Sequence, residues 1–177
     1  MKMSTRRLTM IGMLCAIAFV IVAFVRIPVV AFLKYEPKDV VITIGGFLFG
    51  PLSAFLISAV VSLVEMVTIS DTGVIGCIMN LLSTCAFACT AAAIYKKMHT
   101  LKGAIVGLAA GTAVMVALML LWNYLITPYY MGYPREAVAA MLVPVFLPFN
   151  LIKGAALTII TFLIYKPLSP ILHGKIK

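Results

Sequence analysis

The chain has 177 residues, of which 64% are hydrophobic and 11% are charged, and 14 Lys and Arg against 5 acids give a formal charge of +9. So apolar a composition argues against a soluble globular protein and indicates that lipid surrounds most of the chain. The length allows one ordinary domain, so we expect residues 1–177 to form a single transmembrane domain. The basic charge would suggest nucleic acid in a soluble protein, but here we expect it to follow membrane topology.

Four apolar runs have about the 20 residues that cross a bilayer, and they cover residues 8–25, 74–95, 103–125 and 146–165. The first run follows basic residues, as in a signal peptide, but further spans follow it and no A-x-A site precedes a polar chain, so we expect it to be retained. The stretch from 40 to 69 fits one long tilted helix or two helices broken at Gly50 and Pro51, because Pro lacks an amide proton and restricts the residue before it.

The distribution of Lys and Arg favours six helices over five. With six helices and the N-terminus inside, nine basic residues are cytoplasmic, namely Lys2, Arg6, Arg7, Lys96, Lys97, Lys102, Lys166, Lys175 and Lys177. Four are then on the outer side, namely Arg26, Lys34, Lys38 and Arg135. Five helices would reverse these counts, so the positive-inside rule predicts an all-α membrane protein with six transmembrane helices and both termini in the cytoplasm. Residues 40–50 span only about 16 Å, so the second helix is expected to be short or to begin in the preceding loop.

Polar side chains gather toward the outer ends of the predicted helices. Asn150 and Lys153 lie a few residues inside the sixth helix, Asn80 lies about 10 Å inside the fourth, and Asn123 and Glu65 lie near the outer ends of the fifth and third. A proton wire or an ion channel would need such groups across the whole bilayer. The pattern therefore predicts a pocket that faces outward.

Asn150 and Lys153 are three residues apart, so they share one helix face and one ligand can meet both. Lys offers three donors, and Asn offers donors and an acceptor, which suits a neutral, oxygen-rich molecule as readily as an anion. A structural interpretation stays open, in which Lys153 snorkels to the outer surface and Asn150 caps the helix after Pro148.

Two outer segments could cover this pocket. The first, "RIPVVAFLKYEPKDV", mixes apolar residues with the polar candidates Tyr35, Glu36 and Asp39, so it can fold onto the membrane surface. The second, "NYLITPYYMGYPRE", is expected to be the longest polar connection and supplies side chains that could stack on a flat ring, Tyr124, Tyr130 and Met131. An interfacial aromatic belt is the alternative for these tyrosines.

Small residues suggest close approaches between backbones. In "ISDTGVIGCIMN", Asp71 or Thr72 can cap a helix start, while Gly73 and Gly76 can admit a ligand or merely form a tight turn and a packing face. Two further small-residue repeats occur in predicted helices, one at Gly103, Gly107 and Gly111 and one at Gly12 and Ala16. Each can pack within the protein or receive a helix of a membrane partner.

Catalytic and metal chemistry find little support in the sequence. Cys77, Cys85 and Cys89 share one predicted helix without a His, Asp or Glu to complete a metal site, and His99 and His173 fall in cytoplasmic segments. Glu65 is the one candidate acid at depth and has no His to pair with. We therefore expect neither an enzyme nor a bound cofactor or metal. Without a G-x-x-x-x-G-K-[ST] motif, uphill transport would need a partner or an ion gradient.

Four strings occur in order over the six predicted helices, namely "FLKYEPKDVVITIGGFLFGP", "TGVIGCIMN", "NYLITPYYMG" and "PFNLIKG". Together they resemble the riboflavin-specific substrate-binding (S) subunit of energy-coupling factor (ECF) transporters, over essentially the whole chain. The resemblance implies a bacterial plasma-membrane protein that captures riboflavin from outside and docks on a transmembrane T component driven by two cytoplasmic ATPases. In similar S subunits the first outer loop covers the ligand.

The resemblance also implies that an A-x-x-x-A face on the first helix meets the T component, and the nearest match here is Gly12 with Ala16. Two alternatives stay open, an S subunit for another vitamin and a secondary carrier that works alone. A carrier would usually show an internal repeat and an ionisable relay through both halves of the membrane, and we find neither.

Overall fold

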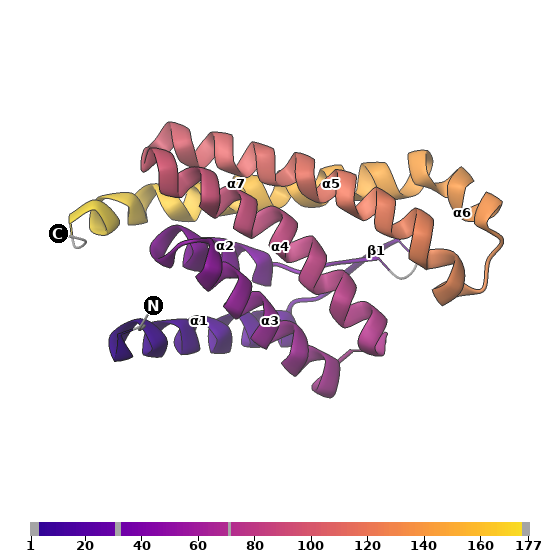
Figure 1. The fold of residues 1–177 in the computed structure, drawn as a ribbon, viewed down its shortest axis with the longest axis horizontal. Helices are drawn as coiled ribbons and strands as arrows, with labels where there is room; N and C mark the ends of the chain where they lie inside the picture. The colour runs from indigo at the N-terminus through magenta and orange to yellow at the C-terminus, as the bar shows by residue number, and fades with distance from the viewer. Residues whose placement is uncertain (1–3, 31–32, 71, 175–177) are drawn as a thin grey trace.

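A computed structural model describes residues 4–30, 33–70 and 72–174, without the side chains of Val30, Met131 and residues 169–174. The chain begins with α1 (Thr5–Phe24), a hairpin of β1 (Ile27–Val30) and β2 (Leu33–Tyr35), and the helices α2 (Lys38–Phe49) and α3 (Pro51–Thr68). These are followed by α4 (Gly73–Met98), α5 (Leu101–Met131), α6 (Arg135–Met141), the π-helical turn η1 (Leu142–Phe146) and α7 (Leu147–Gly174). The helices form an elongated bundle in which α1 begins and α7 ends at the same end, opposite the hairpin (Figure 1).

Within the described ranges, five helical segments are long and apolar enough to cross a membrane, namely Thr5–Phe24, Pro51–Thr68, Gly73–Met98, Leu101–Tyr130 and Arg135–Leu168. The 12-residue α2 reaches only about 18 Å, yet nine of its residues are buried, so it lies inside the bundle. The helical membrane bundle is therefore confirmed. The count of six spans and the cytoplasmic termini stay predictions.

The ambiguous stretch from 40 to 69 forms two helices. Gly50 separates them with φ +90° and ψ 171°, a backbone conformation that is open essentially to glycine alone, and Pro51 begins α3. The guanidinium of Arg7 donates to the carbonyl of Phe49 and to the Ser53 hydroxyl, which lies 2.7 Å away. Because Phe49 ends α2, this contact ties α1 to the junction between α2 and α3.

The helices α4 and α5 approach each other closely through small residues. A Cβ added at Gly107 would lie 2.7 Å from the Ala91 carbonyl oxygen, and one added at Gly111 would lie 2.5 Å from that of Phe87. Such distances leave no room for a side chain. The repeat along α5 therefore packs inside the protein at these two positions, one of the two uses that the sequence left open.

The main apolar core joins α2, α4, α5 and α7 near the end of the bundle where α7 ends. Phe47, Tyr95 and Tyr165 form an aromatic cluster there, and the hydroxyl groups of the two tyrosines are 2.8 Å apart. Each hydroxyl thus has a polar partner although both side chains are buried. This core fixes α7 against α2 and α4, the helices that position the polar residues at the opposite end.

Both outer segments are more regular than the sequence suggested. The strands β1 and β2 form an antiparallel hairpin, in which Ile27 pairs with Tyr35 and Pro28 with Lys34. The expected loop after Asn123 is largely helical, because α5 continues through Pro128 to Met131. A proline in a helix costs one backbone hydrogen bond, which the surrounding turns of this 31-residue helix tolerate. Gly132, with φ +67°, then ends it.

Candidate ligand-binding site

Four polar residues that the sequence placed at similar depth line one cavity beneath the hairpin. They are Asn80 of α4, Asn123 of α5, and Asn150 and Lys153 of α7, and the empty space there, including its opening to solvent, is about 380 Å³. Its other lining residues are Leu33, Lys34, Met79, Ser83, Met119 and Phe149. We call this space the central cavity. Residues far apart in the sequence thus meet because three helices end next to one hairpin.

Three further cavities adjoin the central cavity and share residues with it. One is lined by Arg26, Glu36, Ser70 and Thr72 and shares Lys34, Met79 and Asn80. A second, between α4 and α5, shares Met79 and includes Gly76, Trp122 and Tyr130. The third lies between the hairpin and α7 and shares Phe149 and Lys153. The hollowed region is therefore larger than the central cavity alone.

Lys153 is held inside the protein by two side chains. Its ammonium lies 3.3 Å from Asp39 Oδ2 and donates to the Ser83 hydroxyl, also at 3.3 Å, and the residue is only 8% exposed. The other oxygen of Asp39 accepts a hydrogen bond of 2.8 Å from Thr84. Lys153 therefore does not snorkel to the surface, and Asp39, which the sequence marked as a ligand-binding candidate, is its counter-ion.

The amide groups of Asn150 and Asn123 are bonded to their own helices. Asn150 Nδ2 donates to the Phe146 carbonyl and Asn123 Nδ2 donates to the Met119 carbonyl, each at 2.7 Å. α7 begins at Leu147 and follows directly on α6 and η1, so Asn150 lies within a continuous helical segment and does not cap a helix start. Pro148 has no amide proton with which to hydrogen-bond the carbonyl oxygen four residues earlier. The π-helical turn η1 lies immediately before α7, at this interruption of the regular hydrogen bonding.

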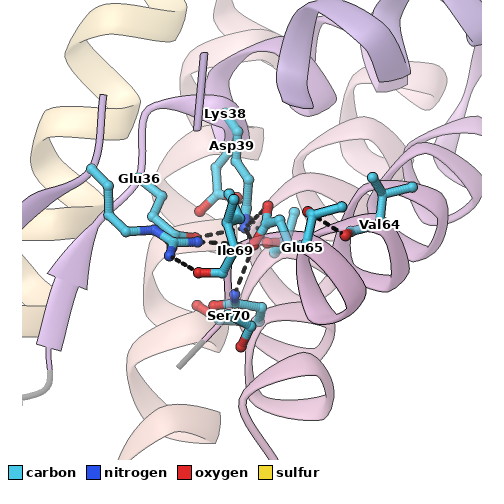
Figure 2. A network of polar contacts seen from close by, with 12 residues as sticks. Glu36, Lys38, Asp39, Val64, Glu65, Ile69 and Ser70 are labelled. Carbon is cyan, nitrogen blue, oxygen red and sulfur yellow. Dashed lines mark hydrogen bonds and ion pairs between the residues drawn. The ribbon is translucent and has the colours of Figure 1, made fainter. Parts of the chain in front are cut away.

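A buried ion-pair network ties the hairpin to α2 and α3 (Figure 2). Lys38, which is 1% exposed, lies 2.6 Å from Glu36 Oε2 and donates to both oxygens of Glu65. Arg26, directly before β1, lies 3.0 Å from Glu36 Oε1 and 3.6 Å from Glu65 Oε2, and it donates to the Ile69 carbonyl. With Asp39 and Lys153, these contacts join three cations and three anions, and Lys34 is a fourth cation that lines the adjoining cavities.

Glu36 lies between β2 and α2 and is 5% exposed. Burial by itself would raise the pKa of its carboxyl group, but the nearby cations Lys38, Lys153 and Arg26 together outweigh that effect and leave the pKa below its ordinary value. Glu36 is therefore a carboxylate at neutral pH. Its interactions with the two neighbouring cations hold both ends of the hairpin.

The remaining candidates from the sequence lie at varied distances from the central cavity. Tyr35 lines the cavity between the hairpin and α7, and its hydroxyl is buried without a hydrogen-bond partner among the described residues. Tyr124 lies at the surface, where the Arg135 guanidinium is 5.7 Å from its ring centroid. The side chain of Met131 lies outside the described residues.

Two glycines at the start of α4 are required by the backbone conformation and by the lack of room for a side chain. Gly73 has φ +56°, in the left-handed region that favours glycine, and a Cβ added at Gly76 would lie 1.7 Å from the Thr72 hydroxyl oxygen. Thr72 precedes α4 but makes no side-chain capping bond, and Asp71 lies outside the described residues. Gly76 and Tyr130 line the cavity between α4 and α5.

The predicted docking face of α1 is uncovered in this chain. Gly12 and Ala16 are both exposed, and a Cβ added at Gly12 would meet nothing within 4 Å among the described residues. At Gly107 and Gly111, by contrast, backbone atoms of α4 occupy the space that a side chain would take. Gly12 and Ala16 therefore have no internal packing role in the described structure, unlike Ala18 of the same helix, which is fully buried.

Several lining residues were not predicted from the sequence. Met79 lines three of the four cavities, and Lys34, Ser83 and Phe149 line the central cavity. Ser83 could have been found, because it follows Asn80 by three residues and shares its helix face. Met79 and Phe149 carry no such signal, since apolar residues fill every helix of this chain.

Comparisons with known proteins agree on one family. The family model of the ECF transporter substrate-specific component matches residues 6–165. The riboflavin transporter FmnP of Bacillus subtilis is 32% identical, with 95% of this chain and 94% of that protein covered. The riboflavin transporter RibU of Staphylococcus aureus is also 32% identical, with 93% of this chain and 90% of that protein covered.

Solved structures share the fold over nearly the whole chain. The S component of a bacterial ECF transporter matches with a TM-score of 0.79 and 32% identity, covering 94% of this chain and 97% of that chain. FolT bound with folic acid matches with a TM-score of 0.57 and 25% identity, covering 99% and 96%. The family consists of transport proteins, not enzymes, and its name implies a transported ligand and no resident cofactor. This chain belongs to the family of substrate-specific (S) components of ECF transporters.

Proposed function

We propose that this protein is the riboflavin-binding S component of an ECF-type vitamin importer in a bacterial plasma membrane. The observation that carries the proposal is the central cavity, in which Asn80, Asn123, Asn150 and Lys153 meet at the hairpin end of the bundle. Similarity to riboflavin transporters at 32% identity supports the choice of ligand. Under the predicted topology this end faces outward, where the vitamin is captured.

The charge of the site suits a neutral ligand. Each buried cation next to the cavity has a carboxylate partner, Asp39 for Lys153 and Glu36 with Glu65 for Lys38. Riboflavin carries no charge, so it would leave these ion pairs intact on entering. A buried site with an uncompensated cation would instead favour an anion, because an unpaired charge away from water is costly.

The shape and chemistry of the lining also suit a flavin. Riboflavin has a flat tricyclic ring with a uracil-like edge and a ribityl chain of hydroxyl groups. Amide groups and an ammonium can bond its oxygens and its N–H group, while Met79 and Phe149 offer apolar contact to the ring. The hairpin supplies Leu33 and Lys34 to the same cavity, so we propose that it covers the bound ligand.

The ligand assignment is tested by titrating purified protein with riboflavin and following quenching of flavin fluorescence. Tight, saturable quenching is expected with no partner protein present. Folic acid serves as the competitor, because FolT, which is 25% identical, was solved with folic acid bound. Displacement of riboflavin by folic acid, or quenching no stronger than with an unrelated membrane protein, would show that the ligand is a different one.

Energy for uptake is proposed to come from partner proteins, a transmembrane T component and two cytoplasmic ATPases. The exposed Gly12 and Ala16 on α1 support this, because small residues let a second helix approach closely in lipid. Liposomes that contain only this protein should bind riboflavin without accumulating it, with or without an ion gradient. Gradient-driven accumulation would instead identify a secondary carrier that works alone.

A further inference from the structure

Glu65 contacts a residue of the central cavity in addition to its cation partners. Asn80 Nδ2 donates to Glu65 Oε2 over 3.2 Å, while the same carboxylate accepts two hydrogen bonds from Lys38. Glu65 is 1% exposed and lies on α3, outside the lining of the central cavity. Among the described residues that line the central cavity, Asn80 is the one that Glu65 contacts.

The chemistry of a carboxylate fixes which way the Asn80 amide points. An ionised carboxylate can only accept hydrogen bonds, so the amide nitrogen of Asn80, and not its oxygen, must face Glu65. The carbonyl oxygen Oδ1 lies in the same amide plane, on the side of the Cβ–Cγ bond away from this anchor. Asn80 lines both the central cavity and the adjoining cavity next to Arg26.

We propose that Glu65 is a positioning residue that orients Asn80 so that its amide oxygen is presented to the ligand as a hydrogen-bond acceptor. The ligand chemistry selected at this point is an N–H or O–H donor. This inference rests on the proposed riboflavin-binding function, and riboflavin carries both kinds of donor. Asn150 is fixed in the same sense, because the backbone carbonyl of Phe146 that faces its Nδ2 is also an acceptor only.

The test measures by what factor Asn80→Ala weakens riboflavin binding in several backgrounds. Lys38→Met/Glu65→Met removes the anchor of Asn80 together with one cation, so that no single charge is left unpaired. Lys38→Met/Glu36→Met is the matched control, because it also removes one cation and one anion but keeps Glu65. Lys38→Met/Glu65→Gln keeps an amide oxygen that can still accept from Asn80.

In the wild type, Asn80→Ala is expected to weaken riboflavin binding about five- to tenfold, the range of one hydrogen bond. The same factor is expected in the Lys38→Met/Glu36→Met control and in the Lys38→Met/Glu65→Gln background. In the Lys38→Met/Glu65→Met background, the factor should fall below about twofold, because the Asn80 amide has already lost its orientation. An undiminished factor in that background would overturn the inference, as would a wild-type protein in which Asn80→Ala costs nothing.

Failure of the proposed function looks different, since the wild type would then not bind riboflavin at all. A second measurement avoids the risk that a double variant does not fold. In wild-type protein labelled with ¹⁵N-asparagine, the side-chain NH₂ signal of Asn80 is assigned by its loss in Asn80→Ala. Slow exchange of these protons with water is expected without and with riboflavin, and fast exchange in both states would overturn the inference.

Discussion

Lys153 of α7 and Asp39 of α2 form a buried ion pair, in which the ammonium lies 3.3 Å from the carboxylate oxygen. Asp39 is 1% exposed and Lys153 is 8% exposed, so neither charge is stabilised by bulk water. Asp39→Asn should destabilise the protein by roughly 3 kcal/mol, because it leaves a buried ammonium without a counter-charge. The thermal unfolding midpoint in detergent measures this loss.

The control for that pair is the double variant Asp39→Asn/Lys153→Met, which removes both charges. It should recover most of the lost stability while still binding riboflavin poorly. Equal midpoints for the single and the double variant would mean that the ion pair does not matter for stability.

Asn150 and Lys153 are proposed to hydrogen-bond the ligand. Asn150→Ala should weaken riboflavin binding roughly tenfold and Lys153→Met should weaken it more, because hydrogen bonds to charged groups contribute about 1.5–3 kcal/mol. Met keeps the length and apolar stem of Lys, so this change isolates the ammonium. Ile159→Ala is the matched control on α7, since Ile159 is 58% exposed. Wild-type affinity in both site variants would leave the pair with a structural role only.

The face of α1 formed by Gly12 and Ala16 should matter for transport and not for binding. Replacing either residue by Leu is expected to leave riboflavin affinity unchanged and to reduce uptake in cells, because the bulky side chain blocks the approach of a partner helix. Val20→Leu, at a position 52% exposed on the same helix, is the control for added bulk. A parallel fall of binding and uptake would refute this assignment.

Close packing between α4 and α5 predicts a contrasting result at Gly111. The Phe87 carbonyl oxygen occupies the space next to Gly111 and would lie 2.5 Å from a Cβ added there. Gly111→Val should therefore lower the free energy of unfolding by about 1–3 kcal/mol, whereas Gly12→Val should not change it. Thermal unfolding of the two purified variants side by side makes this comparison.

The low pKa of Glu36 predicts how stability changes with pH. A carboxyl group whose pKa is lowered on folding stabilises the protein above its unfolded pKa, and this contribution is lost as pH falls through the folded value. The unfolding midpoint should thus hold between neutral pH and about pH 5 and decline below about pH 4. In Glu36→Gln the decline should be shallower, and an identical decline would assign it to other groups.

The helices and the depth of the polar residues could be predicted because both depend on local sequence. Apolar runs set the spans, and Asn80, Asn123, Asn150 and Lys153 could be placed by counting residues from the predicted helix ends. The break between α2 and α3 was visible in Gly50 and Pro51, which permit and favour it. The outward-facing ligand site itself remains a proposal.

Tertiary contacts could not be predicted in the same way. Nothing in the sequence indicates that Lys38 pairs with Glu65 or that Lys153 pairs with Asp39, since the two residues of each pair lie on different helices and are not neighbours in the sequence. Physical chemistry requires only that buried charges find partners. The outer segment after Asn123 was expected to be a polar connection, but the helix continues past Pro128.

The most direct test of the proposed site is an experimental structure of the protein purified with riboflavin. Flavin density is expected in the central cavity, beneath the hairpin, with ligand oxygen or nitrogen atoms within about 3.2 Å of the side chains of Asn150 and Lys153. Flavin bound elsewhere on the protein, or an empty central cavity at saturating riboflavin, would contradict the account.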